Sequence, residues 1–298
     1  MTSVVQPQPD APQRQPEAIP IEPGVEAYGG EYQAQQLAKY RDREHNHWKI
    51  RIDLARRLFD EHVPAGACTT ASQPMRLIDV GCSIGTFAIE FARQGCEAFG
   101  VDYDANAIEA ARALAKEEGV SATFSTSDAQ DVAQEHGLFD VAVCFDLFEH
   151  LFDDQMGALF ASLHRALAPG GVILFHTFPT EYEYIFQENG GRLGKGLEPF
   201  AHIDDPSFAR LTRAYAALHD VWRLFNFGTT HSESIQTWQH CNPTTPGRLS
   251  AILQRAGFEI LEIEVADLYP FKTEARERHN GQRVAMRNLF GAARLSAG

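Results

Sequence analysis

Three side chains that could perform acid–base or metal chemistry follow one apolar run, in the segment CFDLFEHLFD at positions 144–153. Asp146 ends the run, and Glu149 and His150 follow three and four residues later. If a helix starts near Asp146, the three polar groups share one face, because residues three and four apart are neighbours on a helix. The trio could bind a divalent metal ion, act as an acid–base site, or only favour the start of a helix.

A second group of candidate residues lies in the segment LIDVGCSIGTF, where an apolar run gives way to a glycine-containing turn. Asp79 lies at the end of the run, and Gly81, Ser83 and Gly85 shape the turn. Glycine allows a tight bend and a close approach of a ligand to the backbone. A dinucleotide-binding turn needs glycine also at the positions of Ser83 and Thr86, so the sequence disfavours nicotinamide chemistry.

These chemical groups need a scaffold, and the pattern between residues 75 and 178 supplies one. Short apolar runs alternate with helical patterns, which predicts parallel strands with helices on both faces. Right-handed crossovers bring the carboxyl ends of the strands to one edge, where ligands bind. Asp102 ends the second strand, where its carboxylate can accept hydrogen bonds from ribose hydroxyls. We predict strands at 75–80, 96–102, 121–126, 139–145, 172–178, 258–265 and 287–295, and helices at 85–95, 104–119, 153–171 and 246–257.

The rest of the chain divides into segments of different composition. Residues 1–23 are rich in Pro and Gln and poor in large apolar groups, which predicts a disordered tail. Residues 24–66 carry apolar stripes at helical spacing and form a predicted N-terminal helical arm. Residues 67–298 form the predicted main domain. An insertion at 179–243 interrupts its alternation of strands and helices on the ligand side, where we expect a substrate lid.

Composition excludes several classes of protein. The formal net charge of −14 argues against a nucleic-acid partner, although Arg51, Arg56 and Arg57 form a local basic patch. No apolar stretch is long enough to predict a membrane span, and the N-terminus shows no secretory signal, so we expect a cytoplasmic protein. The five cysteines are scattered, without a CxxC pair, which favours reduced thiols. The sequence leaves open whether the protein forms a homodimer.

The motifs occur in a recognisable order: DVGCSIG at 79–85, Asp102, SDA at 127–129, FDVAVCFDLFEHL at 139–151, and LHRALAPGGVILF at 163–175. This order resembles class I S-adenosylmethionine (SAM)-dependent methyltransferases, and most of all the small-molecule O-methyltransferases of ubiquinone biosynthesis. The resemblance implies a doubly wound, seven-stranded, mostly parallel α/β sheet of the Rossmann-like type, with SAM as cofactor.

The resemblance also implies a role for each residue of the cofactor site. Asp79 would face the methionine end of SAM, Asp102 its ribose hydroxyls, and Phe145 its sulfonium. Asp128 would bind the adenine amino group, with the Ala129 backbone N–H on the ring. A helix-capping role for Asp128 is the alternative. Gly81, Ser83 and Gly85 would form the turn beside the methionyl and ribose parts, with Ser83 in place of the family's middle glycine.

The same resemblance bears on the trio at the end of the fourth strand. Ubiquinone-biosynthesis relatives carry Glu-x-x-Glu-His there and are proposed to bind a divalent ion, for which Asp146, Glu149, His150 and His240 would be the ligands in this chain. We favour a site without metal in which His150 is the general base, because imidazole titrates in the neutral range.

The expected function is therefore SAM-dependent methyl transfer to a small molecule, in the first place O-methylation of a partly hydrophobic, hydroxylated acceptor. Methylation at nitrogen or carbon is an alternative, because no residue pattern defines the acceptor atom. A SAM-binding protein without catalysis is another.

Overall fold

The computed structural model describes residues 30–43, 47–63, 74–134, 137–151, 153–178, 244, 246–267 and 287–296, and every statement below concerns these residues. The predicted tail at 1–23, the predicted lid at 179–243 and His240 lie outside them. No described helix combines the length and the apolar character that a membrane crossing needs.

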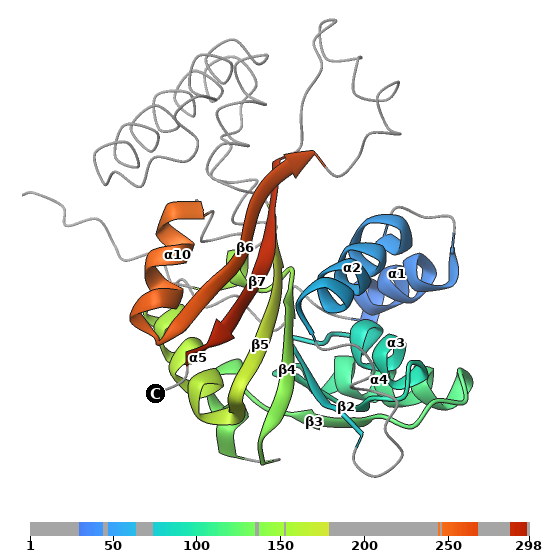
Figure 1. The fold of residues 1–298 in the computed structure, drawn as a ribbon. Coiled ribbons are helices and arrows are strands. Elements are labelled where there is room, and N and C mark those ends of the chain that lie inside the picture. The colour runs from blue at the N-terminus through green and yellow to red at the C-terminus, as the bar shows by residue number, and fades with distance from the viewer. Residues whose placement is uncertain are drawn as a thin grey trace, which may run out of the picture.

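A single sheet of seven strands forms the centre of the molecule (Figure 1). Its strand order is β3-β2-β1-β4-β5-β7-β6. Only β7 runs antiparallel to its neighbours, β5 and β6. The predicted doubly wound, mostly parallel sheet is confirmed. The strands are β1 (Arg76–Val80), β2 (Glu97–Asp102), β3 (Thr123–Thr126), β4 (Phe139–Phe145), β5 (Leu167–Thr177), β6 (Phe258–Asp267) and β7 (Arg287–Leu295).

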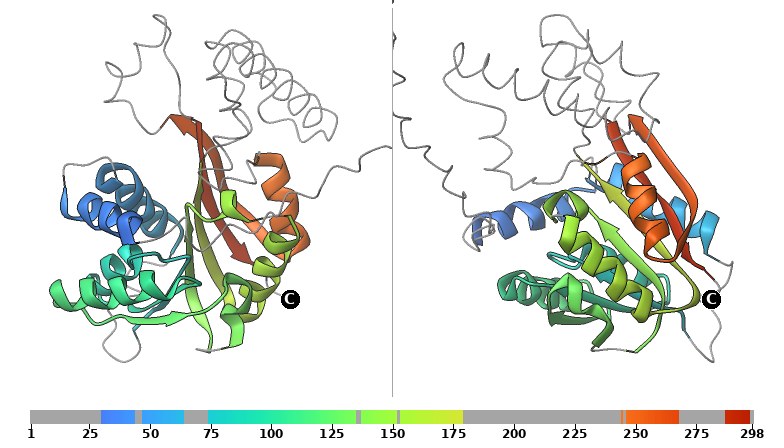
Figure 2. Two further views of the ribbon diagram at one scale, coloured as in Figure 1. Left: turned by 180° about the vertical axis from the view of Figure 1, so that it is seen from behind. Right: turned by 90° about the vertical axis from the view of Figure 1, so that its left-hand side faces the viewer.

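Helices cover both faces of the sheet (Figure 2). One hydrophobic cluster joins α2, α3 and α4 to one face, and a second joins α5 and α10 to the other. This two-sided burial explains why strands such as β4 are almost wholly apolar. The helices are α1 (Gly30–Arg41), α2 (Asp53–His62), α3 (Thr86–Arg93), α4 (Ala105–Glu117), α5 (Asp153–Ala166) and α10 (Pro246–Arg255), with a π-helix η2 (His47–Ile52) and 3-10 helices η3 (Ala129–Gln134) and η4 (Phe148–His150).

One predicted boundary is wrong. The helix expected at 153–171 ends at Ala166, and β5 begins at the next residue. Pro169 cannot continue a helix, because it lacks an N–H and clashes with the preceding turn. Gly170, with φ of +78°, then bends the chain, and the pairing of β4 with β5 shifts register between Phe139 and Val141. The Pro-Gly-Gly sequence therefore lies inside a bent strand and does not cap the helix.

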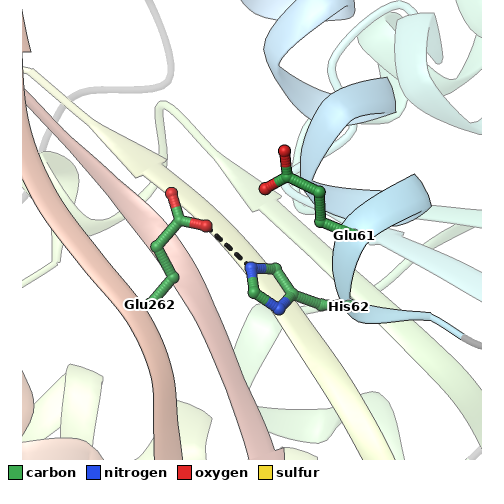
Figure 3. A group of neighbouring side chains, drawn as sticks. All are labelled: Glu61, His62 and Glu262. Carbon is green, nitrogen blue, oxygen red and sulfur yellow. Dashed lines mark hydrogen bonds and ion pairs between the residues drawn. The ribbon is translucent and has the colours of Figure 1, made fainter.

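The helices before β1 are attached to the domain by ion pairs. Arg57 in α2 binds Glu262 in β6, with Nη2 2.7 Å from Oε1. His62 Nε2 lies 2.7 Å from the other oxygen of Glu262, and Glu61 lies alongside (Figure 3). Glu61 also pairs with Arg57. Each arginine of the predicted basic patch has an acidic partner: Arg51 binds Asp146, Arg56 binds Glu90 and Arg57 binds Glu262. The patch is therefore internally neutralised and does not form a free basic surface.

The cysteines depart in one place from the expectation of reduced thiols. Cys82 and Cys144 are free and buried. Cys96, which directly precedes β2, is disulfide-bonded, so the expectation is wrong at that position. The other two cysteines lie outside the described residues.

The tight pairing of β7 with β6 can be tested through Gly291. A Cβ at this position would lie 2.0 Å from the Glu262 backbone oxygen and 2.9 Å from Phe175 Cζ. We expect Gly291→Ala to lower the free energy of unfolding by about 1–3 kcal/mol, because the edge strand must move away. Urea denaturation measures the change.

Gly157→Ala is the matched control. Gly157 lies in α5, and a Cβ there would meet no atom within 4 Å. The control should gain roughly 0.5–1 kcal/mol, because alanine restricts the unfolded chain and favours the helix. Equal stability of Gly291→Ala and the parent would show that β6 can shift without cost.

Candidate active site

Three carboxylates lie together where neighbouring strands end. Asp79 is the penultimate residue of β1, Asp102 is the last of β2, and Asp146 follows β4 directly. Because β1 lies between β2 and β4 and all three are parallel, these carboxylates occupy one edge of the sheet. The predicted ligand-binding edge is therefore the place where the acids meet.

Asp79 is a buried acid with few partners. Its residue is only 1% exposed, and Oδ2 accepts a hydrogen bond from the Ala88 backbone N–H at 3.1 Å. Burial raises the pKa of Asp79 to about 7, against the opposing effect of the Ala88 N–H. A cation beside this carboxylate would restore its charge, because an opposite charge favours the ionised form.

The turn after β1 depends on backbone conformations that side chains rarely adopt. Gly81 and Gly85 have φ of +72° and +80°, and Ser83 has φ of +48°. A Cβ on Gly85 would also lie 2.6 Å from Phe124 Cε1, so only glycine fits there. Ser83 is strained for a non-glycine residue, and its buried hydroxyl has no hydrogen-bond partner among the described residues. Strain together with an unpaired polar atom is typical of a ligand site.

Asp102 links this turn to the start of α4. Its two carboxylate oxygens accept the backbone N–H groups of Ser83, at 2.8 Å, and Asp104, at 3.0 Å. Each oxygen has a second lone pair, so the side chain can still accept from a ligand. Burial raises the pKa of Asp102, and the two N–H groups oppose that rise.

Three further predicted cofactor residues lie at the same edge. Asp128 is exposed, and its Oδ1 accepts from the Gln130 N–H at 2.9 Å, which is the helix-capping contact considered as the alternative. Ala129 follows as the first residue of η3. Phe145 is only 4% exposed, and its ring contacts Phe87, with centroids 4.8 Å apart.

The segment after β4 does not begin a helix at Asp146, so that expectation is wrong. Asp146 has φ of +52°, η4 starts only at Phe148, and α5 starts at Asp153. The Asp146 side chain is 36% exposed, so part of it can meet a ligand. Its Oδ2 lies 2.7 Å from Arg51 Nε, and its Oδ1 lies 2.7 Å from His176 Nδ1. Burial opposes ionisation, but Arg51 and His176 outweigh it and hold the pKa of Asp146 well below its usual range.

Glu149 behaves in the opposite way. It is 1% exposed, and its Oε2 accepts from Thr177 Oγ1 at 2.7 Å. Burial, together with the nearby charge of Asp146, raises the pKa of Glu149 to about 8. His150 ends η4 and is partly exposed.

The three residues of the predicted trio therefore do not face one another as a ligand set. A different group in the described ranges has His and acid ligand atoms that all lie within 4.8 Å of one another. It consists of Glu61, His62 and Glu262, whose positions in the sequence are far from the segment after β4. Arg57 already donates hydrogen bonds to both acids of that group.

Sequence reasoning missed the residues that hold Asp146. Arg51, in η2, binds it across 95 positions of the chain. His176, fully buried in β5, also lies 2.9 Å through Nε2 from Asn288 Oδ1, and Arg51 Nη1 lies 3.4 Å from the same oxygen. Arg51, Asp146, His176 and Asn288 thus form a closed polar ring. The sequence feature that could have pointed to this ring is His176, a polar residue inside an otherwise apolar strand.

Helix α1 reaches over the same edge. Gln33 Nε2 donates to Asp104 Oδ2 at 2.8 Å, in a buried contact. Burial, followed by the charges of Asp146 and Asp102, raises the pKa of Tyr32 to about 12.

The buried Glu149 predicts an unusual dependence of stability on pH. The folded protein retains the Glu149 proton up to about pH 8, whereas the unfolded chain releases it near pH 4.5. The free energy of unfolding should therefore decrease as pH rises between these values, by at most about 1.4 kcal/mol per pH unit for each such group. Asp79 acts in the same direction up to about pH 7.

Glu149→Gln keeps the shape of the side chain without a titrating proton. We expect its unfolding free energy, measured in urea from pH 5.5 to 8.5, to vary less with pH than that of the parent. Parallel pH profiles for the two proteins would contradict the assignment of the buried proton to Glu149.

Comparison with known proteins identifies the family. The model of a methyltransferase domain matches residues 47–263, well over half of the chain. A ubiquinone biosynthesis O-methyltransferase of Pectobacterium carotovorum is 34% identical over 103 residues, which span 34% of this chain and 42% of that protein. The protein of the same name from Thiobacillus denitrificans is 30% identical over 146 residues, which span 46% of this chain and 62% of that protein. Each match thus covers less than two thirds of the relative's length.

Solved structures support the fold. Magnesium protoporphyrin IX methyltransferase from Synechocystis, solved with bound SAH, covers 91% of this chain with a TM-score of 0.53 at 15% identity, and 98% of that chain is covered. The YcgJ protein from Bacillus subtilis covers 83% of this chain with a TM-score of 0.52 at 15% identity, and 99% of that chain is covered. The match to the family model and the strand order together show that this chain belongs to the methyltransferase-domain family and has its class I, Rossmann-like fold.

Proposed function

We propose that this protein transfers the methyl group of SAM to a hydroxyl of a partly hydrophobic small molecule. The observation that carries the proposal is the row of acids at one edge, with Asp79 and Asp102 beside the strained turn and Asp146 next to them at the end of β4. The first two suit a cofactor, and the third lies where an acceptor would meet it. The printed names of the relatives, O-methyltransferases of ubiquinone biosynthesis, support a hydroxyl acceptor.

The residues present fit SAM. The buried carboxylate of Asp79 suits the ammonium group of the methionine part, and the unpaired hydroxyl of Ser83 offers a hydrogen bond beside it. Asp102 keeps lone pairs for the ribose hydroxyls. The remaining assignments are Gly81 and Gly85 in the turn, Asp128 and Ala129 at the adenine, and Phe145 near the sulfonium.

We assign the general base to His150. SAM supplies an electrophilic methyl group on a good leaving group, so the protein must align the acceptor and accept its proton. Asp146 is a weak base, because Arg51 and His176 hold its charge. Glu149 is buried and retains its own proton at neutral pH. His150 is partly exposed, as Asp146 is, and it has an imidazole, the side chain that suits the task. The segment 179–243 would close over the acceptor.

The first experiment is transfer of labelled methyl from SAM into a metabolite extract, with and without EDTA. We expect incorporation that survives EDTA, and mass analysis of the product then shows whether oxygen, nitrogen or carbon is methylated. His150→Gln should lower the rate by about 10²–10⁴-fold, as for the loss of a general base. Its affinity for S-adenosylhomocysteine (SAH) should stay unchanged.

Each other outcome has a distinct meaning. Incorporation that EDTA abolishes and magnesium restores would assign the trio to a metal ion. Full activity of His150→Gln would remove His150 as the base. SAH binding without methyl transfer to any component would support a protein that binds the cofactor without catalysis.

The assignment of Asp79 predicts how cofactor binding depends on pH. The ammonium of SAH needs an ionised carboxylate, whereas free Asp79 has a pKa of about 7. Affinity should therefore rise with pH up to about 7 and level off above it, with release of a proton on binding. Calorimetry in two buffers of different ionisation enthalpy measures both effects.

Asp79→Asn provides the comparison. The amide cannot ionise, so this variant should bind SAH more weakly and without proton release. Proton release that persists in Asp79→Asn would assign the proton to another group.

A further inference from the structure

Helix α1 lies on the face of the sheet that α3 and α4 cover, and it contacts α4 (Figure 1). Near its start, Gln33 Nε2 donates a hydrogen bond to Asp104 Oδ2 at 2.8 Å. At its end, Arg41 Nη2 lies 2.8 Å from Oε2 of Glu117, the last residue of α4. Asp104 is the N-cap of α4, so the two helices run side by side in the same direction. Because α4 begins just after the carboxyl end of β2, the first turn of α1 lies at the ligand-binding edge.

The two attachments of α1 to α4 differ in their surroundings. Gln33 and Asp104 are only 8% and 5% exposed, and their hydrogen bond is buried. The side chains of Arg41 and Glu117 are both 54% exposed, so water competes for their ion pair. Removal of the Gln33 donor would take a partner from a buried carboxylate oxygen, and such a loss is costly. The Gln33 contact therefore constrains Asp104 more strictly than the Arg41 pair constrains the other end of α4.

Asp104 connects Gln33 to the acid at the end of β2. The Asp104 backbone N–H donates to Asp102 Oδ1 at 3.0 Å, and the Ser83 N–H donates to Oδ2 at 2.8 Å. Oδ1 of Asp104 accepts the Asn106 N–H at 2.9 Å and thereby caps α4. Asp102 itself is partly exposed, so its carboxylate remains accessible to a ligand. A displaced Asp104 would withdraw one of the two N–H groups that orient this carboxylate.

We propose that Gln33 is a positioning residue that orients Asp102 toward the ribose hydroxyls of SAM through its hydrogen bond to Asp104. The inference rests on the proposed function and deepens it, because it makes α1 a part of the cofactor site. A carboxylate that is already held in the binding orientation loses little further freedom when the hydroxyls bind. The docking of α1 and the occupancy of the cofactor site are then linked, so each favours the other.

The test compares SAH with its 2′,3′-dideoxy analogue, which lacks only the two ribose hydroxyls, by calorimetric titration into the full chain. We expect the parent protein to bind SAH about 10–100-fold more tightly, as hydrogen bonds to a charged acceptor imply. Gln33→Met keeps the length of the side chain but removes the donor. It should lower this affinity ratio by about three- to tenfold, by weakening SAH and not the analogue. A role of Gln33 in packing alone would weaken both ligands equally, and that result overturns the inference.

Arg41→Met is the matched control, because it breaks the exposed contact at the other end of α1. It should leave the affinity ratio unchanged. Asp102→Ala should abolish the preference for SAH, and Gln33→Met should have no further effect on the ratio in that background, since both act through one carboxylate. The inference is overturned if Arg41→Met lowers the ratio as much as Gln33→Met does. It is also overturned if the effect of Gln33→Met persists in the absence of Asp102.

Hydrogen exchange of the α1 amides measures the same link from the opposite side. Because coupling between two equilibria is reciprocal, saturation with SAH should slow exchange in α1 of the parent protein by about the same three- to tenfold. The dideoxy analogue should slow it less, and in Gln33→Met the two ligands should act alike. Exchange in α1 that SAH and the analogue slow equally in the parent protein contradicts the inference.

The parent protein alone separates this inference from the proposed function. If it does not bind SAH, the proposed function fails and the inference fails with it. If it binds SAH and the dideoxy analogue equally, Asp102 does not bind the ribose, so the inference is overturned while methyl transfer from SAM stands. A preference for SAH that Gln33→Met retains in full overturns the inference alone.

Discussion

The ion pair between Arg51 and Asp146 is the contact on which the candidate site depends. Asp146 adopts a left-handed conformation that costs a non-glycine residue on the order of 1–3 kcal/mol, so its surroundings must enforce it. Arg51 and His176 hold the carboxylate from two sides, and Asn288 closes the ring. Charges that are partly withdrawn from water need such complete pairing. The ring joins the segment before β1 to the ends of β4, β5 and β7.

The ring also explains why two acids three residues apart differ so much. Asp146 has a guanidinium beside it and stays ionised, whereas Glu149 faces the interior and has a hydroxyl as its partner. The charge on Asp146 raises the pKa of Glu149 further. Environments that push two pKa values apart assign different roles to chemically similar groups. Here the result is one fixed negative charge on Asp146 and one retained proton on Glu149.

Local patterns were enough to predict most of the fold. The positions of the strands along the chain follow from apolar runs of the right length, as do the acids near the carboxyl ends of β1 and β2, and the predicted strand at 287–295 matches β7. The conformation of Asp146 was not predictable, because it depends on Arg51, which lies 95 positions away, and on Asn288 in the last strand. The end of α5 was missed for a different reason, since the rule that Pro-Gly closes a helix also fits a bent strand.

The position of the cations has a consequence for chimeric proteins. The short segment 51–57 supplies an arginine partner to each of three acids, Asp146, Glu90 and Glu262. These acids belong to three separate elements, the β4 end, α3 and β6. A sheet of this family transplanted behind a different leading helix would therefore keep its strands but lose an arginine partner in three places at once. Recombination between relatives should be tolerated only where the crossover keeps these arginines and their acids in the same parent.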